Sequence, residues 1–63
     1  MTLREFIREH REELDECIAR RMSVPGATVQ VDDLQYRNDE ERRLWILNDE
    51  GLYNWARSEG VRI

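Results

Sequence analysis

The first third of the chain has the alternation of hydrophobic and polar positions that is typical of an amphipathic helix. At about 100° per residue, its apolar or weakly polar side chains fall within a stripe about 120° wide, and nearly all other positions are charged. The positions in this stripe are Leu3, Phe6, Ile7, His10, Leu14, Cys17 and Ile18. Thr2 and Glu5 have the spacing of a capping box, in which each side chain satisfies a free backbone N–H at a helix start. We therefore expect a helix over residues 3–22.

A second helical pattern covers residues 39–59. Asn38 and Glu41 repeat the capping-box spacing at its start. Gly60 suits the position just beyond a helix end, where Val61 would make the hydrophobic contact of a Schellman motif. If the segment is one continuous helix, its apolar stripe contains Leu44, Trp45, Leu52, Trp55 and Ala56.

Two features of this second segment indicate a break. Asn48 lies inside the apolar stripe, and Gly51 costs about 1 kcal/mol relative to alanine in a helix interior. The same residues fit a turn near 48–51, with Asn48 or Asp49 capping a third helix. The sequence admits both the continuous and the broken helix.

The connector between the two helical patterns is long for a helical hairpin. Pro25 and Gly26 fit the central positions of a type II turn. Residues 27–31 alternate between apolar and polar, which predicts a short strand that pairs with the alternating tail at Val61 and Ile63, or with its own copy in a dimer. An extended loop whose valines cover the helix ends explains the same pattern. The expected fold is thus a mainly α two-helix hairpin, one domain over residues 1–63, which dimerisation would complete.

Composition narrows the classes of function. The chain has 63 residues, with 14 acidic and 10 basic side chains and a net charge of −4. This balance argues against nucleic-acid binding through a basic footprint and against docking on an anionic membrane. No apolar run approaches the 18 residues of a membrane span, and the first residues do not resemble a signal peptide, so we expect a cytoplasmic protein. All the basic residues are arginines, which reflects either the codon bias of a GC-rich genome or a use of arginine in bidentate pairing with carboxylates.

Candidates for catalytic or metal chemistry are few. His10 has no second histidine to share a metal with, and Cys17 is the single cysteine. Seven residues of helix separate the two by about 10 Å, which is too far for a nucleophile and its base. We expect a packed histidine that bonds to Asn48 or to an acid, no metal or cofactor, and no enzymatic activity. The paired carboxylates are expected on solvated faces.

Aromatic and apolar residues in the second half indicate a contact surface instead. Trp45 and Trp55 are expected in the core, whereas Ile46, Leu47 and Tyr53 lie off the main stripe of a continuous helix and would be exposed in a monomer. The arginines expected at the rim of this partner-binding patch are Arg42, Arg43 and Arg57. If the helix breaks, the same residues complete one core.

Three functions are compatible with these features. The first is a small protein-interaction module, a regulator or inhibitor of the kind encoded by short prokaryotic or phage reading frames, which docks on a protein partner or forms a homodimer. The second is an acidic mimic of nucleic acid that would present Glu5, Glu9, Glu12, Glu13 and Glu16. The third is a helix-turn-helix DNA-binding protein, with its turn at 48–51 and residues 52–59 in the groove.

Overall fold

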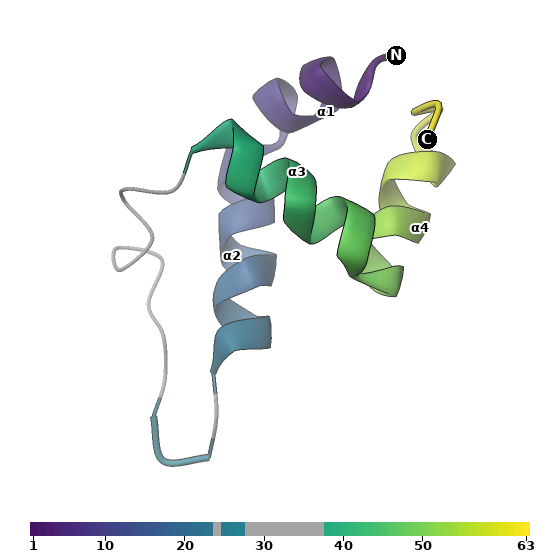
Figure 1. Ribbon diagram of the computed structural model, residues 1–63. Coiled ribbons are helices and arrows are strands. Elements are labelled where there is room, and N and C mark those ends of the chain that lie inside the picture. The colour runs from purple at the N-terminus through teal and green to yellow at the C-terminus, as the bar shows by residue number, and fades with distance from the viewer. Residues whose placement is uncertain (24, 28–37) are drawn as a thin grey trace.

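The computed structural model describes residues 1–23, 25–27 and 38–63, which form four helices and no extended strand. In chain order these are α1 (Leu3–Glu9), α2 (Arg11–Met22), α3 (Asp39–Asn48) and α4 (Glu50–Ser58). Figure 1 shows α1 at the top of α2, α3 crossing these two helices, and α4 running back towards the level of α1. Helix α3 packs on α1, α2 and α4 and so occupies the middle of the fold.

The mainly α class is confirmed, but the predicted two-helix hairpin is wrong. Each of the two expected helices is broken once, the first between Glu9 and Arg11 and the second between Asn48 and Glu50. Of the predicted strand over 27–31, residues 28–31 lie outside the described residues. The tail does not serve as its strand partner in the part of the chain that the structure describes, because Val61 is buried in the helical core.

The predicted helix start at Thr2 and the predicted helix end at Gly60 are confirmed. Thr2 and Glu5 form a complete capping box, in which the Glu5 N–H donates to Thr2 Oγ1 at 3.1 Å. Gly60 has φ of 91°, and the Val61 N–H donates to the Ala56 carbonyl at 3.1 Å, which is the long bond of a Schellman motif. Gly26 has φ of 85°, as the third position of a type II turn requires.

The break at His10 was not predicted. Its backbone has φ of −121° and ψ of 24°, and its N–H is shared between the carbonyls of Phe6 and Ile7. The side chain makes no capping hydrogen bond to α2. Instead its ring lies 4.7 Å from the ring of Phe6 and 5.2 Å from that of Trp55, measured between centroids. Packing against α4, and not a local signal, therefore accounts for the bend.

The break at Asp49 confirms the broken alternative for the second segment. The Asp49 carboxylate accepts the Leu52 N–H at 3.0 Å and caps α4, while its other oxygen accepts from Arg21 Nε at 2.7 Å. Gly51 leaves room for this pair, because a Cβ atom there would lie 2.8 Å from Arg21 Nη2. The junction of α3 and α4 is thus tied to the end of α2.

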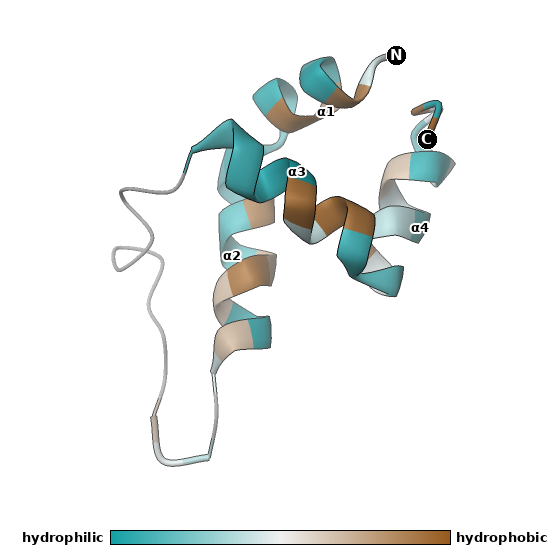
Figure 2. Ribbon diagram, viewed as in Figure 1, coloured by the Kyte–Doolittle hydropathy of each residue, from teal (hydrophilic) through white to brown (hydrophobic). Residues whose placement is uncertain are grey.

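The core collects apolar side chains from all four helices and the tail. Its buried members are Phe6, Ile7, Leu14, Ile18, Ala19, Ile46, Leu52, Ala56 and Val61. The two tryptophans, Trp45 and Trp55, are half-buried and pack against this core, as expected. Figure 2 shows that α3 is hydrophilic in its first half and hydrophobic in its second. The second half of α3 therefore supplies both core and surface.

Candidate functional site

The outer side of α3 carries two exposed leucines. Leu44 is 47% exposed and Leu47 is 38% exposed. They are three residues apart in a helix, so their side chains are neighbours on one side of it. Together with the half-buried Trp45, we call Leu44 and Leu47 the α3 apolar surface.

A depression of about 300 Å³ adjoins this surface, lined by Leu44, Trp45, Asn48 and Asp49. Its polar groups are already engaged. The Asn48 amide donates to the Leu44 carbonyl at 2.8 Å, and the Asp49 carboxylate is held by Arg21 and the Leu52 N–H. The Arg21 guanidinium, followed by the Leu52 N–H, lowers the pKa of Asp49 below its ordinary value. The groups that would gain most from being covered are therefore the leucines.

The predicted patch of Ile46, Leu47 and Tyr53 is only partly where it was expected. Ile46 is 0% exposed and belongs to the core, so its exposure, expected for a continuous helix, is wrong, and the alternative stated for a broken helix is confirmed for this residue. Leu44, which was expected in the core stripe, is exposed in its place. The break at Asp49 explains the exchange, because α4 no longer continues the direction of α3 and packs against the side that carries Ile46. Leu47 is exposed as predicted, and Tyr53 is half-buried on α4.

Arg42 was expected at the rim of the patch and is instead 9% exposed. It donates through Nε and Nη2 to the two carboxylate oxygens of Asp15, both at 2.9 Å, and through Nη1 to Asp39 at 2.8 Å. Asp39 in turn accepts two bonds from Arg11. The Arg11 guanidinium, with Arg42, lowers the pKa of Asp39, and the bond to Asp15 raises that of Arg42. This chain of alternating charges joins α2 to α3 and uses arginine for bidentate pairing, the second of the two interpretations of the arginine-only composition.

The other two predicted rim arginines are exposed, and each contacts a neighbour on its own helix. Arg43 donates to Glu40 at 3.0 Å, which lowers the pKa of that carboxyl. The Arg57 guanidinium carbon lies 5.9 Å from the centre of the Tyr53 ring, within the range of a cation–π contact. Arg43 lies on the exposed side of α3, whereas Arg57 and Tyr53 are on α4.

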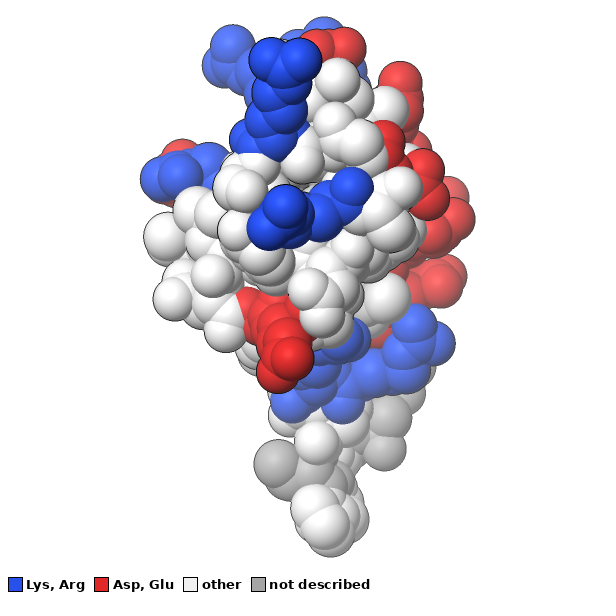
Figure 3. All heavy atoms as spheres, turned by 90° about the vertical axis from the view of Figure 1, so that its right-hand side faces the viewer, with Lys and Arg blue, Asp and Glu red and all other residues white. Residues whose placement is uncertain are grey.

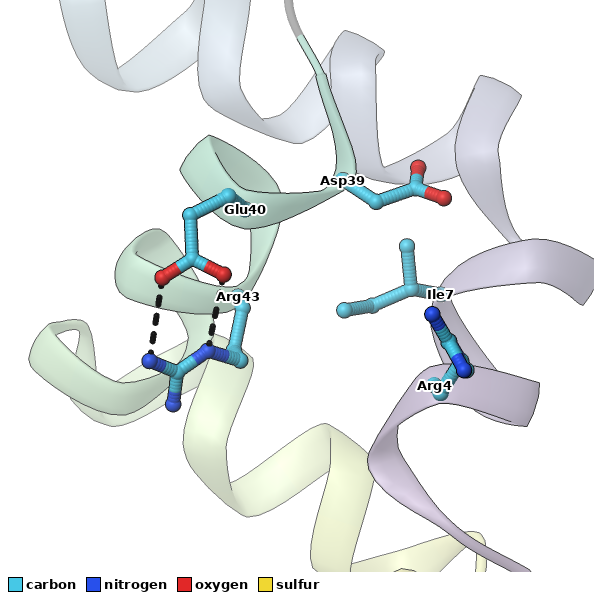
Figure 4. Close-up of a pocket in the computed structure, with 5 residues that line it drawn as sticks. All are labelled: Arg4, Ile7, Asp39, Glu40 and Arg43. Atoms are coloured by element: carbon cyan, nitrogen blue, oxygen red, sulfur yellow. Dashed lines mark hydrogen bonds and ion pairs between the residues drawn. The ribbon is translucent and has the colours of Figure 1, made fainter.

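A second depression, also of about 300 Å³, lies between α1 and α3. Figure 4 shows Arg4 and Ile7 of α1 facing Asp39, Glu40 and Arg43 of α3. Each acid there already bonds to an arginine, Asp39 to Arg11 and Arg42, and Glu40 to Arg43. Asp39 therefore links α3 to α2, Glu40 pairs within α3, and the α3 apolar surface is the stronger candidate site.

The chemistry considered for His10 and Cys17 gains no support from their contacts. The expected packing of His10 is confirmed by its contacts with two aromatic rings, whereas the Asn48 amide N–H donates to the Leu44 carbonyl and not to His10. The Cys17 sulfur accepts from Arg20 Nη2 at 3.3 Å. Among the described residues, no group of three histidine, cysteine, aspartate or glutamate side chains is placed to hold a metal ion.

No protein-family model matches the chain, and neither a curated protein nor a solved structure matches it. None of the helices in the described ranges combines the length and the apolar character needed to cross a membrane. Leu44 and the depression beside it were missed by the sequence analysis. The available signal was the Asp49-to-Leu52 cap, since a helix that ends at Asn48 no longer shares an apolar stripe with Leu52 and Trp55, and it was this stripe that placed Leu44 in the core.

Proposed function

We propose that this chain is a small, non-catalytic protein-interaction module, a regulator or inhibitor that docks through the α3 apolar surface. The observation that supports the proposal is the exposure of Leu44 and Leu47 side by side, next to an apolar depression. Within the described residues, the other leucines are buried or half-buried. Adjacent exposed apolar side chains on a small domain are typical of a contact surface.

The rigid support of this surface also favours recognition. Arg42 fixes α3 to α2 through Asp15, and Arg21 fixes the end of α3 through Asp49. Ile46, one residue before Leu47, is fully buried and anchors the same turn from the inside. A surface held in place in the free protein loses little conformational entropy when it binds.

The two alternative functions have less support. For the acidic mimic, Glu5 is already engaged with Thr2, and Figure 3 shows arginines over much of the face that carries a row of acids along one edge. For the helix-turn-helix, the exposed side of α4 offers Arg57, which lies over Tyr53, and Ser58, whose hydroxyl donates to the Trp55 carbonyl at 2.7 Å. The exposed end of α4 carries Glu59 beside Arg57 and so lacks the strongly basic surface of a DNA-binding helix.

The proposal is tested with the double variant Leu44→Gln/Leu47→Gln, and Glu16→Gln on the exposed side of α2 is the control. Sedimentation measures self-association, and calorimetry measures affinity for a purified partner isolated from the native cell. Because burying a leucine contributes about 1.5–3 kcal/mol and these two are partly exposed, we expect a loss of roughly tenfold or more in association. The control should bind normally. If the double variant associates as tightly as the natural chain, the surface is not the docking site.

A further inference from the structure

The charged residues around the α3 apolar surface indicate which kind of partner fits it. Carboxylates lie at both ends of the surface. Three are in the first turn of α3, Asp39, Glu40 and Glu41, and two are at the start of α4, Asp49 and Glu50. Arg43 is the one basic residue on the exposed side of α3, and it is bonded to Glu40. Asp49 is compensated by Arg21 from α2, whereas Glu50 is exposed at the start of α4. The surface is thus apolar in its middle and acidic at its ends.

This arrangement does not suit a second copy of the chain. If two α3 helices pair in parallel about a twofold axis, Glu40 of each copy lies opposite Glu40 of the other. If they pair antiparallel with Leu44 opposite Leu47, the acidic first turn of one α3 approaches the α3–α4 junction of the other copy, where Asp49 and Glu50 lie. Like charges placed opposite one another at an interface disfavour association.

The small area of the α3 apolar surface also argues against a dimer of two copies. A stable interface buries about 800 Å² on each partner. The accessible surface of the whole chain is 4569 Å², so such a dimer would cover roughly a sixth of it. Two partly exposed leucines and a half-buried tryptophan supply only part of that area, and the remainder of any α3-to-α3 contact would be acidic.

We infer that the occupant of the α3 apolar surface is a basic amphipathic helix of another protein. Such a helix would place apolar side chains, spaced three or four residues apart, on Leu44, Leu47 and the adjoining depression. Lysine or arginine residues on either side of them would lie over the acidic ends of the surface, towards Glu40 and Glu50. This inference rests on the proposed function, because it names the partner of the same surface.

The test uses two synthetic peptides with the same helical pattern of leucines. One carries lysines at both ends of the leucine stripe, and its twin carries glutamine at those positions. Each is titrated into the isotope-labelled full chain up to about 1 mM, so that weak binding is still detected. We expect the basic peptide to bind at least about tenfold more tightly than its twin. The amide resonances that shift should centre on residues 44–48.

Matched charge variants distinguish this surface from general attraction to an acidic protein. Glu40→Gln/Glu50→Gln removes the two carboxylates at the ends of the surface. Glu9→Gln/Glu16→Gln removes the same charge from exposed positions of α1 and α2. The first variant should weaken binding of the basic peptide by roughly three- to tenfold, and the second should leave it nearly unchanged.

Each contrary result has a distinct meaning. Equal binding of both peptides at residues 44–48 overturns the basic partner but keeps the contact surface. A dimer in sedimentation that Leu44→Gln/Leu47→Gln dissociates makes a second copy the occupant, and this also leaves the proposed function standing. Failure of both peptides to bind overturns the inference alone. Binding of the basic peptide that is unaffected by Leu44→Gln/Leu47→Gln places the contact elsewhere and contradicts both proposals.

Discussion

At His10 and at Asp49 the chain makes the same kind of turn, with one non-helical residue between two helices, but different interactions hold the two turns. Asp49 caps the following helix with its side chain and receives a bond from Arg21. His10 makes no side-chain cap, and its ring packs against those of Phe6 and Trp55, which also contact each other. One junction is thus held by polar bonds and the other by aromatic packing. The comparison teaches that a helix break can be determined locally at one place and by the tertiary fold at another.

The largest effect should follow from Phe6→Ala, which removes the buried ring that supports the His10 junction. Phe6 is fully buried and lies 4.9 Å from the Trp55 ring, centroid to centroid. Truncation of a buried phenylalanine costs about 3–5 kcal/mol, which is a large part of the stability of so small a domain. Urea unfolding followed by circular dichroism should show this loss, and Phe6→Leu should lose much less. A cost below about 1 kcal/mol for Phe6→Ala would show that packing does not hold this junction.

Acidification should act mainly on the polar junction and the ion pairs. The pKa values of Asp39 and Asp49 are lowered from the ordinary 3.8 by their bonds to Arg11 and Arg21, respectively. Because the folded-state values lie below the unfolded ones, these carboxylates contribute their full stability above the unfolded value and lose it as the pH falls through the folded one. The free energy of unfolding should therefore be nearly constant from about pH 7 to 5.5 as far as these groups are concerned, and should fall below about pH 4. Urea titrations across that range measure it.

Asp49→Asn provides the control for the acid response, because it removes the titrating group at the junction. The fall in stability at low pH should be smaller in this variant than in the natural chain. An identical fall in both would mean that the Arg21 pair does not contribute to the pH dependence.

The smallest effect should come from Asp49→Ala at neutral pH. It removes the α4 cap, for which losses of about 0.5–2 kcal/mol are typical, and the partly exposed pair with Arg21, which adds at most about 1 kcal/mol. Asp49→Asn keeps a capping side chain and should retain part of the stability, as urea unfolding can show. If Asp49→Ala costs as much as Phe6→Ala, the contrast between a polar and a packed junction does not hold.

The parts of the fold that follow from neighbouring residues could be predicted from the sequence. The Thr2 cap, the Schellman end at Gly60 and the alternative break near 48–51 each depend on side chains within a few positions of the backbone groups they satisfy. The break at His10 could not be predicted in this way. Its cause is a ring contact with Trp55, which lies 45 residues away in the sequence. No glycine, proline or capping residue marks the break.

In the candidate site, too, the features that depend on distant contacts could not be predicted from the sequence. Leu47 was identified because it lies off the stripe of a continuous helix and is exposed in the broken helix as well. Leu44 was expected to be buried and Ile46 exposed, and the structure shows the reverse. The expectation was wrong because the apolar stripe was derived for a continuous helix, whereas α3 ends at Asn48. Arg42 was placed at the surface because its partner Asp15 lies 27 residues away in the sequence, so no local spacing reveals the pair.

The ring cluster at the first junction provides a built-in probe of the assembled protein. The chain has a single histidine, so its imidazole proton resonances can be assigned without isotope labelling. With the rings of Phe6 and Trp55 close by, ring-current fields displace those resonances from their positions in a free peptide. A one-dimensional proton spectrum thus reports directly whether α1, α2 and α4 have come together, in any variant or any complex.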